Sequence, residues 1–99
     1  MDVAAGYALG VWAKRRYRFL KGHRPVMYTN LLTTGALDTH LQETERQAVE
    51  MAEHLTSEMA KRESINEDMK AVNSIAWVQA MSNIQARVRE VVNNDIIFT

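Results

Sequence analysis

The 99-residue sequence has no cysteine, one proline and four glycines. Without cysteine the chain forms neither disulfides nor thiolate sites, which argues against a secreted disulfide-built scaffold and favours a cytoplasmic protein. No run of β-branched residues alternates with period two, so strands are not expected. The length suits one domain better than two. We therefore predict a single all-α domain over residues 1–99 that needs no cofactor.

The chain also lacks a long hydrophobic run. The weakly apolar residues 3–13 are too few to cross a bilayer. Asp2 precedes this stretch and the basic residues follow it, which reverses the order found in signal peptides. We expect no membrane contact, and we interpret residues 1–8 as a disordered or divergent start.

Apolar residues recur at intervals of three and four, which is typical of amphipathic helices. The pattern predicts a small bundle of three main helices plus one short helix, in which a long antiparallel hairpin forms the centre. The expected segments are 9–21, 26–34, 36 or 38–62, a brief turn through 71, and 75–97.

Residues that favour helix ends mark several boundaries. Gly22 is placed to end the first helix and Gly35 the second, while Pro25 suits a first helical turn. Ser64, with Glu67 three residues later, is typical of a capping box. Ser74 is a candidate cap for the last helix.

The apolar rows of these helices define an expected core. On the short second helix, Val26, Met27 and Leu32 are expected to turn inward, and the row of the last helix is expected to end at Asp95 and Ile96. The main core candidates are Trp12, Phe19, Leu31, Leu41, Leu55, Trp77, Met81, Ile84 and Val88. Two alternatives stay open: some of the aromatic rings could stack on unpaired bases, and Asn83, beside the row, could fix the register of a helix pair.

Charge is distributed very unevenly along the chain. Residues 3–37 hold six Lys or Arg and no acid, whereas residues 38–99 hold six Lys or Arg and eleven Asp or Glu, many on the outer face of the third helix (Glu43, Glu45, Glu50, Glu53 and Glu58). On a helical wheel the cations of the first helix share the outer face, and only Arg16 falls on the apolar side. The candidate DNA-binding residues are Lys14, Arg15, Arg18, Lys21, His23 and Arg24.

Three interpretations of this basic cluster remain open. It could bind nucleic-acid phosphates, pair with the acidic third helix of the same or another chain, or form a solvated helix face whose aliphatic stems cover apolar surface. A helix-turn-helix interpretation favours the first helix and the turn as the DNA contact, because the segment after Pro25 carries no cation up to residue 34.

Motifs for catalysis and metal binding are missing from the sequence. Glu50 and His54 lie one helical turn apart, but the second histidine of a zinc-helix motif is absent. No glycine-rich phosphate loop or nucleophile elbow is present. We expect no enzyme, no catalytic residue and no metal site.

The string YTNLLTTGALDTHLQETERQAVEM, residues 28–51, resembles the family of transposon-encoded protein TnpV. The resemblance continues through the Ile-x-Glu-x-x-Lys-Ala of residues 65–71 and the closing residues 95–98, and it covers about residues 9–99. Members commonly carry a further segment before the Leu-Gly of positions 9 and 10. The chain begins almost at this pair, which fits a divergent or truncated start.

This resemblance implies a protein encoded beside a large serine recombinase on a mobile element, with an accessory part in excision or its control. It brings no catalytic residues. Joined with the basic cluster, it predicts a non-enzymatic protein that contacts DNA phosphates. The alternative is a helical interaction module, a homodimer through the third and last helices or a partner of the recombinase, that does not bind DNA.

Overall fold

The computed structural model describes residues 9–99 and is all-α over that range. Its helices are α1 (Val11–His23), α2 (Pro25–Thr33), α3 (Leu37–Arg62), α4 (Glu67–Val72) and α5 (Ser74–Val92), followed by a π-helical turn, η2 (Asn93–Ile97). The predicted all-α class is thereby confirmed, but two helices are short, α2 and α4, where one short helix was predicted beside the three main ones. The interpretation of residues 1–8 as a disordered or divergent start falls outside the described range.

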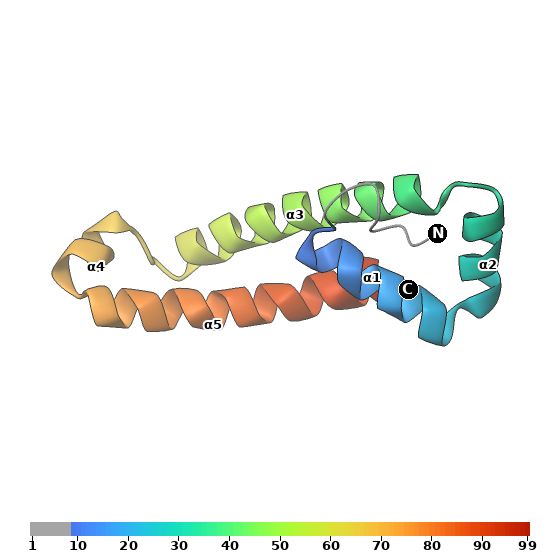
Figure 1. Ribbon diagram of the computed structural model, residues 1–99. Helices are drawn as coiled ribbons and strands as arrows, with labels where there is room; N and C mark the ends of the chain where they lie inside the picture. The colour runs from blue at the N-terminus through green and yellow to red at the C-terminus, as the bar shows by residue number, and fades with distance from the viewer. Residues whose placement is uncertain (1–8) are drawn as a thin grey trace.

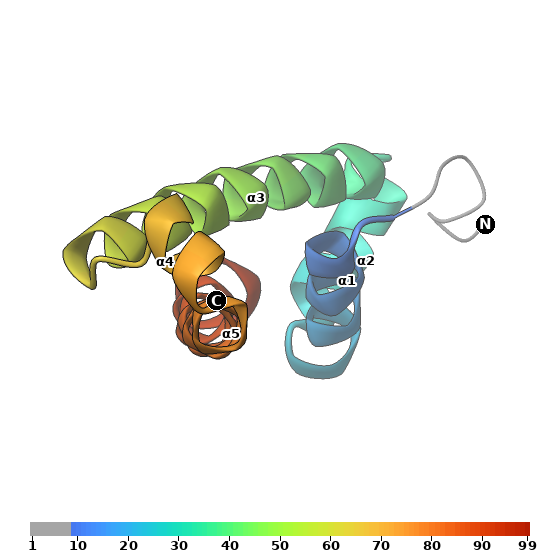
Figure 2. The ribbon, with the colours of Figure 1, turned by 90° about the vertical axis from the view of Figure 1, so that its left-hand side faces the viewer.

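Helix α3 is the longest helix in residues 9–99, and the molecule is elongated, measuring 54 × 24 × 17 Å. Helix α5 returns antiparallel to α3 after the short α4, which forms the expected long hairpin (Figure 1). Helix α1 packs on the amino-terminal part of α3, and α2 closes that end of the molecule. Figure 2 shows α1 and α5 on the same side of α3.

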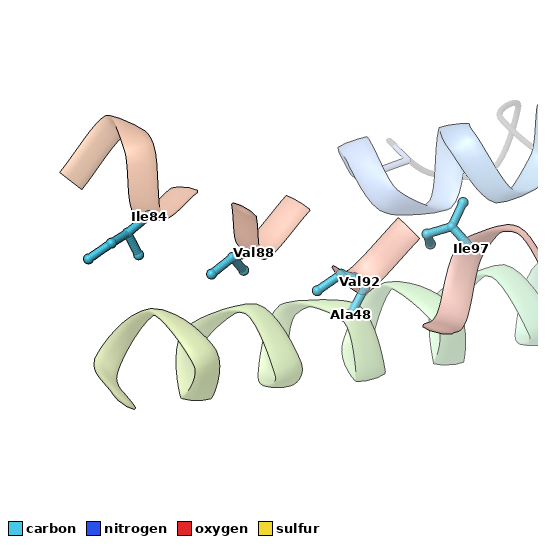
Figure 3. Packing of buried hydrophobic residues seen from close by; sticks show 5 residues of the cluster. All are labelled: Ala48, Ile84, Val88, Val92 and Ile97. Atoms are coloured by element: carbon cyan, nitrogen blue, oxygen red, sulfur yellow. The ribbon is translucent and has the colours of Figure 1, made fainter. Parts of the chain in front are cut away.

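Two groups of buried apolar residues hold this arrangement. The first joins α1 to α3 through Ala13, Leu20, Leu37 and Leu41. The second joins α3 to α5 and η2 through Ala48, Ile84, Val88, Val92 and Ile97 (Figure 3). Full burial of a leucine or isoleucine contributes about 1.5–3 kcal/mol, so these contacts supply much of the stability of so small a domain.

The expected core residues occupy three kinds of position. Leu41, Ile84 and Val88 are buried. Leu31 packs against the first cluster at its edge, and Trp12, Leu55 and Met81 pack against the second. Phe19 and Trp77 are half-buried and belong to neither cluster.

Some inward positions were predicted wrongly. Val26, Met27 and Leu32 of α2 are exposed, because this short helix meets the rest of the protein mainly through Leu31 and Tyr28. Asn83 is exposed as well, so within this chain it is not a buried amide that fixes the register of α3 and α5.

The last turn of the chain departs from the α-helical period. The buried row of α5 runs through Ile84, Val88 and Val92, and an α-helix would continue it near Asp95 and Ile96. Instead Phe98 N donates to the carbonyl of Asn93, an i to i+5 bond of 2.8 Å. Because the π turn holds one residue more, Ile97 is buried and Asp95 is exposed, while Ile96 packs at the edge of the second cluster as expected.

The helix ends follow the sequence signals only in part. Pro25 begins α2, and Gly35 ends the turn after it with a φ of +76°. Gly22 does not end α1, which continues to His23. Ser64 has a φ of +58° and so cannot adopt the extended conformation of a capping residue; Asn66 caps α4 instead, accepting from Met69 N at 3.0 Å.

The last helix also begins differently from the prediction. Asn73 caps α5, with its side-chain oxygen accepting a hydrogen bond from Ala76 N at 3.1 Å. Ser74, the predicted cap, is the first residue inside the helix. A side-chain acceptor at this position satisfies one of the backbone N–H groups that every helix start leaves without an intrahelical partner.

Candidate nucleic-acid interface

The amino-terminal end of α1 is fixed by a residue of α3. The Glu45 carboxylate accepts a hydrogen bond from Ala13 N at 2.9 Å and so replaces the side-chain cap that α1 lacks. The approach is so close that a Cβ on Gly10 would overlap this carboxylate. Glu45 is half-buried here, which corrects its expected place on the acidic outer face of α3.

Arg16 is removed from the basic cluster because it lies in the interior, 4% exposed. Its guanidinium donates to the carbonyl of Ile97 at 2.8 Å and to the backbone and side-chain oxygens of Thr99 at 3.4 Å. Burial, reinforced by the positive charge of Arg24, lowers the pKa of Arg16. Arg16 therefore has a structural role, because it holds the end of the chain against α1. Its place on the apolar side of the helical wheel indicated this role.

The remaining cations of α1 lie on its outer face. Lys14, Arg18 and Lys21 are exposed and follow one another at helical spacing of four and three residues. Arg15 is half-buried, and His23 and Arg24 are exposed at the end of the helix. We call the six side chains Lys14, Arg15, Arg18, Lys21, His23 and Arg24 the basic strip.

Within residues 9–99 no carboxylate forms an ion pair with the basic strip. Two acidic residues of α3 are paired within that helix: Arg46 bridges Glu43 and Glu50 on its exposed face. The Arg46 guanidinium correspondingly lowers the pKa of Glu43. Pairing between the basic strip and α3 of the same chain, one of the three open interpretations, is thus not formed in this part of the chain.

Aromatic rings take the place of carboxylates as neighbours of the basic strip. The Arg15 guanidinium lies 5.0 Å from the centre of the Trp12 ring, and Lys21 Nζ lies 5.1 Å from that of Tyr17. Arg24 lies 5.6 Å from the Phe19 ring. Such cation–π contacts orient the side chains without neutralising their charge, so the strip can still attract anions.

An arginine from the other end of the chain lies near the basic strip. Arg89 of α5 lines a shallow groove of about 420 Å³ together with residues of α1 and the C-terminal turn. The groove residues are Arg15, Arg18, Phe19, His23, Arg89, Asn93 and Phe98. No local pattern marks Arg89, because only tertiary packing brings it near the basic strip.

Features of other site types are missing from the part of the chain that the structure covers. Across residues 9–99 no three His, Asp or Glu side chains come close enough to hold a metal ion. In the same range, no helix combines the length and the apolar character required to cross a membrane.

Comparison with known proteins adds a family to this geometry. Neither a curated protein nor a solved structure matches the chain. The family model described as transposon-encoded protein TnpV matches residues 2–97, which is nearly the whole sequence. The chain therefore belongs to the TnpV family of transposon-encoded proteins.

Proposed function

We propose that this transposon-associated protein is a non-enzymatic accessory factor that binds DNA phosphates through the basic strip and assists excision of the element or its regulation. The observation that carries the proposal is that the six basic side chains of the basic strip, along α1 and just after it, have no carboxylate partner in residues 9–99. Phosphates are attracted to such a face by charge and by the release of counterions.

The shape of the molecule suggests how it would sit on DNA. Helix α1 lies in one half of a 54 Å long structure, and α4 lies at the far end of the other half. Binding through α1 would leave α4 free to meet a protein such as the recombinase of the element. Phosphate contacts of this kind position a protein on DNA without reading its sequence.

The test is a gel shift with duplex DNA over a range of salt concentrations. We expect the wild type to bind at low salt, and the triple variant Lys14→Ala, Arg15→Ala, Arg18→Ala to bind more weakly. Its plot of log affinity against log salt should be shallower by about 0.9 for each phosphate that the variant no longer neutralises.

A matched control removes the same charge from the other end of the molecule. Lys61, Arg62 and Lys70 are exposed cations near α4, and their triple alanine variant should keep the affinity of the wild type. An equal weakening in both triple variants would show a nonspecific charge effect. Absence of wild-type binding at low salt would refute the proposal.

A second candidate function is binding of a protein partner without DNA. It is favoured by apolar side chains around the junction of α4 and α5, where Val72, Ile75 and Val78 are 88%, 71% and 54% exposed. Light scattering over a range of concentrations separates the two functions. A stable dimer without DNA affinity would support this second function, whereas a monomer that binds DNA would support the first.

A further inference from the structure

The groove between α1 and the C-terminal turn offers both positive charge and aromatic rings. A DNA duplex would make use of the positive charge alone. Three arginines from two helices, Arg15, Arg18 and Arg89, line it and supply positive charge. The rings of Phe19 and Phe98 lie beside them, with centres 5.4 Å apart. Phe98 is 46% exposed, so part of its ring is open to a ligand in the groove.

A ligand that satisfies both features carries an anion and an aromatic ring. In a duplex the bases are stacked inside and only phosphates would reach the arginines, so the exposed phenylalanine would gain little. In an unpaired strand a base can turn outward and stack on an aromatic ring while its phosphate binds arginine. The volume of about 420 Å³ lies within the range of small-molecule sites and suits one nucleotide.

We infer that this groove binds an unpaired nucleotide of single-stranded DNA, with its phosphate on the arginines and its base against Phe98. The inference rests on the proposed function, since it assigns a form of DNA to the same surface. It implies a preference for opened or single-stranded segments such as those exposed when DNA strands are separated.

The experiment compares three fluorescent ligands of equal length with the full chain: a mixed-sequence single strand, an abasic single strand and a duplex. Anisotropy titrations at low salt should show the base-containing strand bound about tenfold more tightly than the abasic strand, as expected for one stacked base. Because the abasic strand keeps its phosphates, this ratio isolates the contribution of the base.

Two variants test the two halves of the groove. Phe98→Leu keeps apolar volume and should abolish most of the preference for bases while leaving abasic binding unchanged, which also shows that the protein is folded. Arg89→Gln should weaken binding of both single strands by severalfold. Arg87→Gln is the matched control, because Arg87 lies on the same helix but pairs with Glu63 away from the groove, and it should change neither affinity.

The outcomes separate the inference from the proposed function. Equal affinity for the abasic strand, the duplex and the base-containing strand overturns the inference and leaves phosphate binding intact. An unchanged preference in Phe98→Leu overturns it as well. Failure to bind any of the three ligands refutes both.

Discussion

The guanidinium of Arg16 donates a hydrogen bond through Nε to Nε2 of His40, 3.2 Å away, across the interface of α1 and α3. The imidazole accepts this bond only when Nε2 carries no proton, so the contact requires neutral His40. Burial and the charge of Arg16 accordingly lower the pKa of His40. The pair makes the packing of the basic helix sensitive to pH.

The first prediction concerns stability in mild acid. The pKa of His40 lies below its ordinary value of 6.5 in the folded protein, so the unfolded chain binds the proton more readily. The free energy of unfolding is therefore highest above that value and falls as the pH drops below it. Urea unfolding between about pH 8 and about pH 5 measures this change. In His40→Gln the slope should flatten, while His54→Gln, an exposed change on the same helix, should keep it.

The second prediction separates buried from exposed arginine on α1. Arg16→Met keeps the aliphatic stem but leaves the carbonyl of Ile97 without its donor, so the free energy of unfolding should fall by about 3 kcal/mol. Arg18→Met removes an exposed charge and should change it by no more than about 0.5 kcal/mol. Denaturation midpoints of the two variants test this directly, and a similar destabilisation in both would contradict the structural role of Arg16.

The third prediction uses two glycines of opposite environment. Gly10→Ala places a methyl group on the Glu45 carboxylate, displaces the cap of α1 and should cost about 1 kcal/mol or more. Gly22 lies inside α1 with no atom near its missing Cβ, so Gly22→Ala should stabilise the protein by about 0.5–1 kcal/mol. Thermal melts followed by circular dichroism should shift in opposite directions, and a gain in stability for Gly10→Ala would disprove the capping role of Glu45.

The fourth prediction compares two isoleucines of α5. Ile84 is fully buried against α3, and Ile84→Ala should lower the free energy of unfolding by about 2–5 kcal/mol. Ile75 is 71% exposed, so Ile75→Ala should lower it by less than about 1 kcal/mol. Equal effects in chemical denaturation would mean that the α3–α5 hairpin is packed differently.

Much of the fold could be predicted because it is encoded locally. The three- and four-residue spacing of apolar side chains indicated the long helices, and Pro25 and Gly35 marked the boundaries of α2. The prediction that Gly22 ends α1 was wrong. A glycine favours a helix end where the backbone becomes left-handed, and the backbone at Gly22 does not. The π turn is also invisible to a fixed period, so Ile97 was missed as an inward residue.

The candidate site could also be predicted only in part from the sequence. The outer position of Lys14, Arg18 and Lys21 follows from the period of one helix, and so does the inward position of Arg16. Glu45 and Arg89 act on this region from other helices. Their contribution depends on how distant segments pack, and no spacing within either helix indicates it.

Among the helices of residues 9–99, α3 alone has buried residues in both apolar clusters: Leu37 and Leu41 in one, Ala48 in the other. If α1 detaches, the hairpin with α5 still holds this helix, and if α5 detaches, α1 still holds its first half. Backbone amides between these positions can therefore exchange their hydrogens with solvent only when the whole domain opens, and they should be the slowest in the protein to take up deuterium.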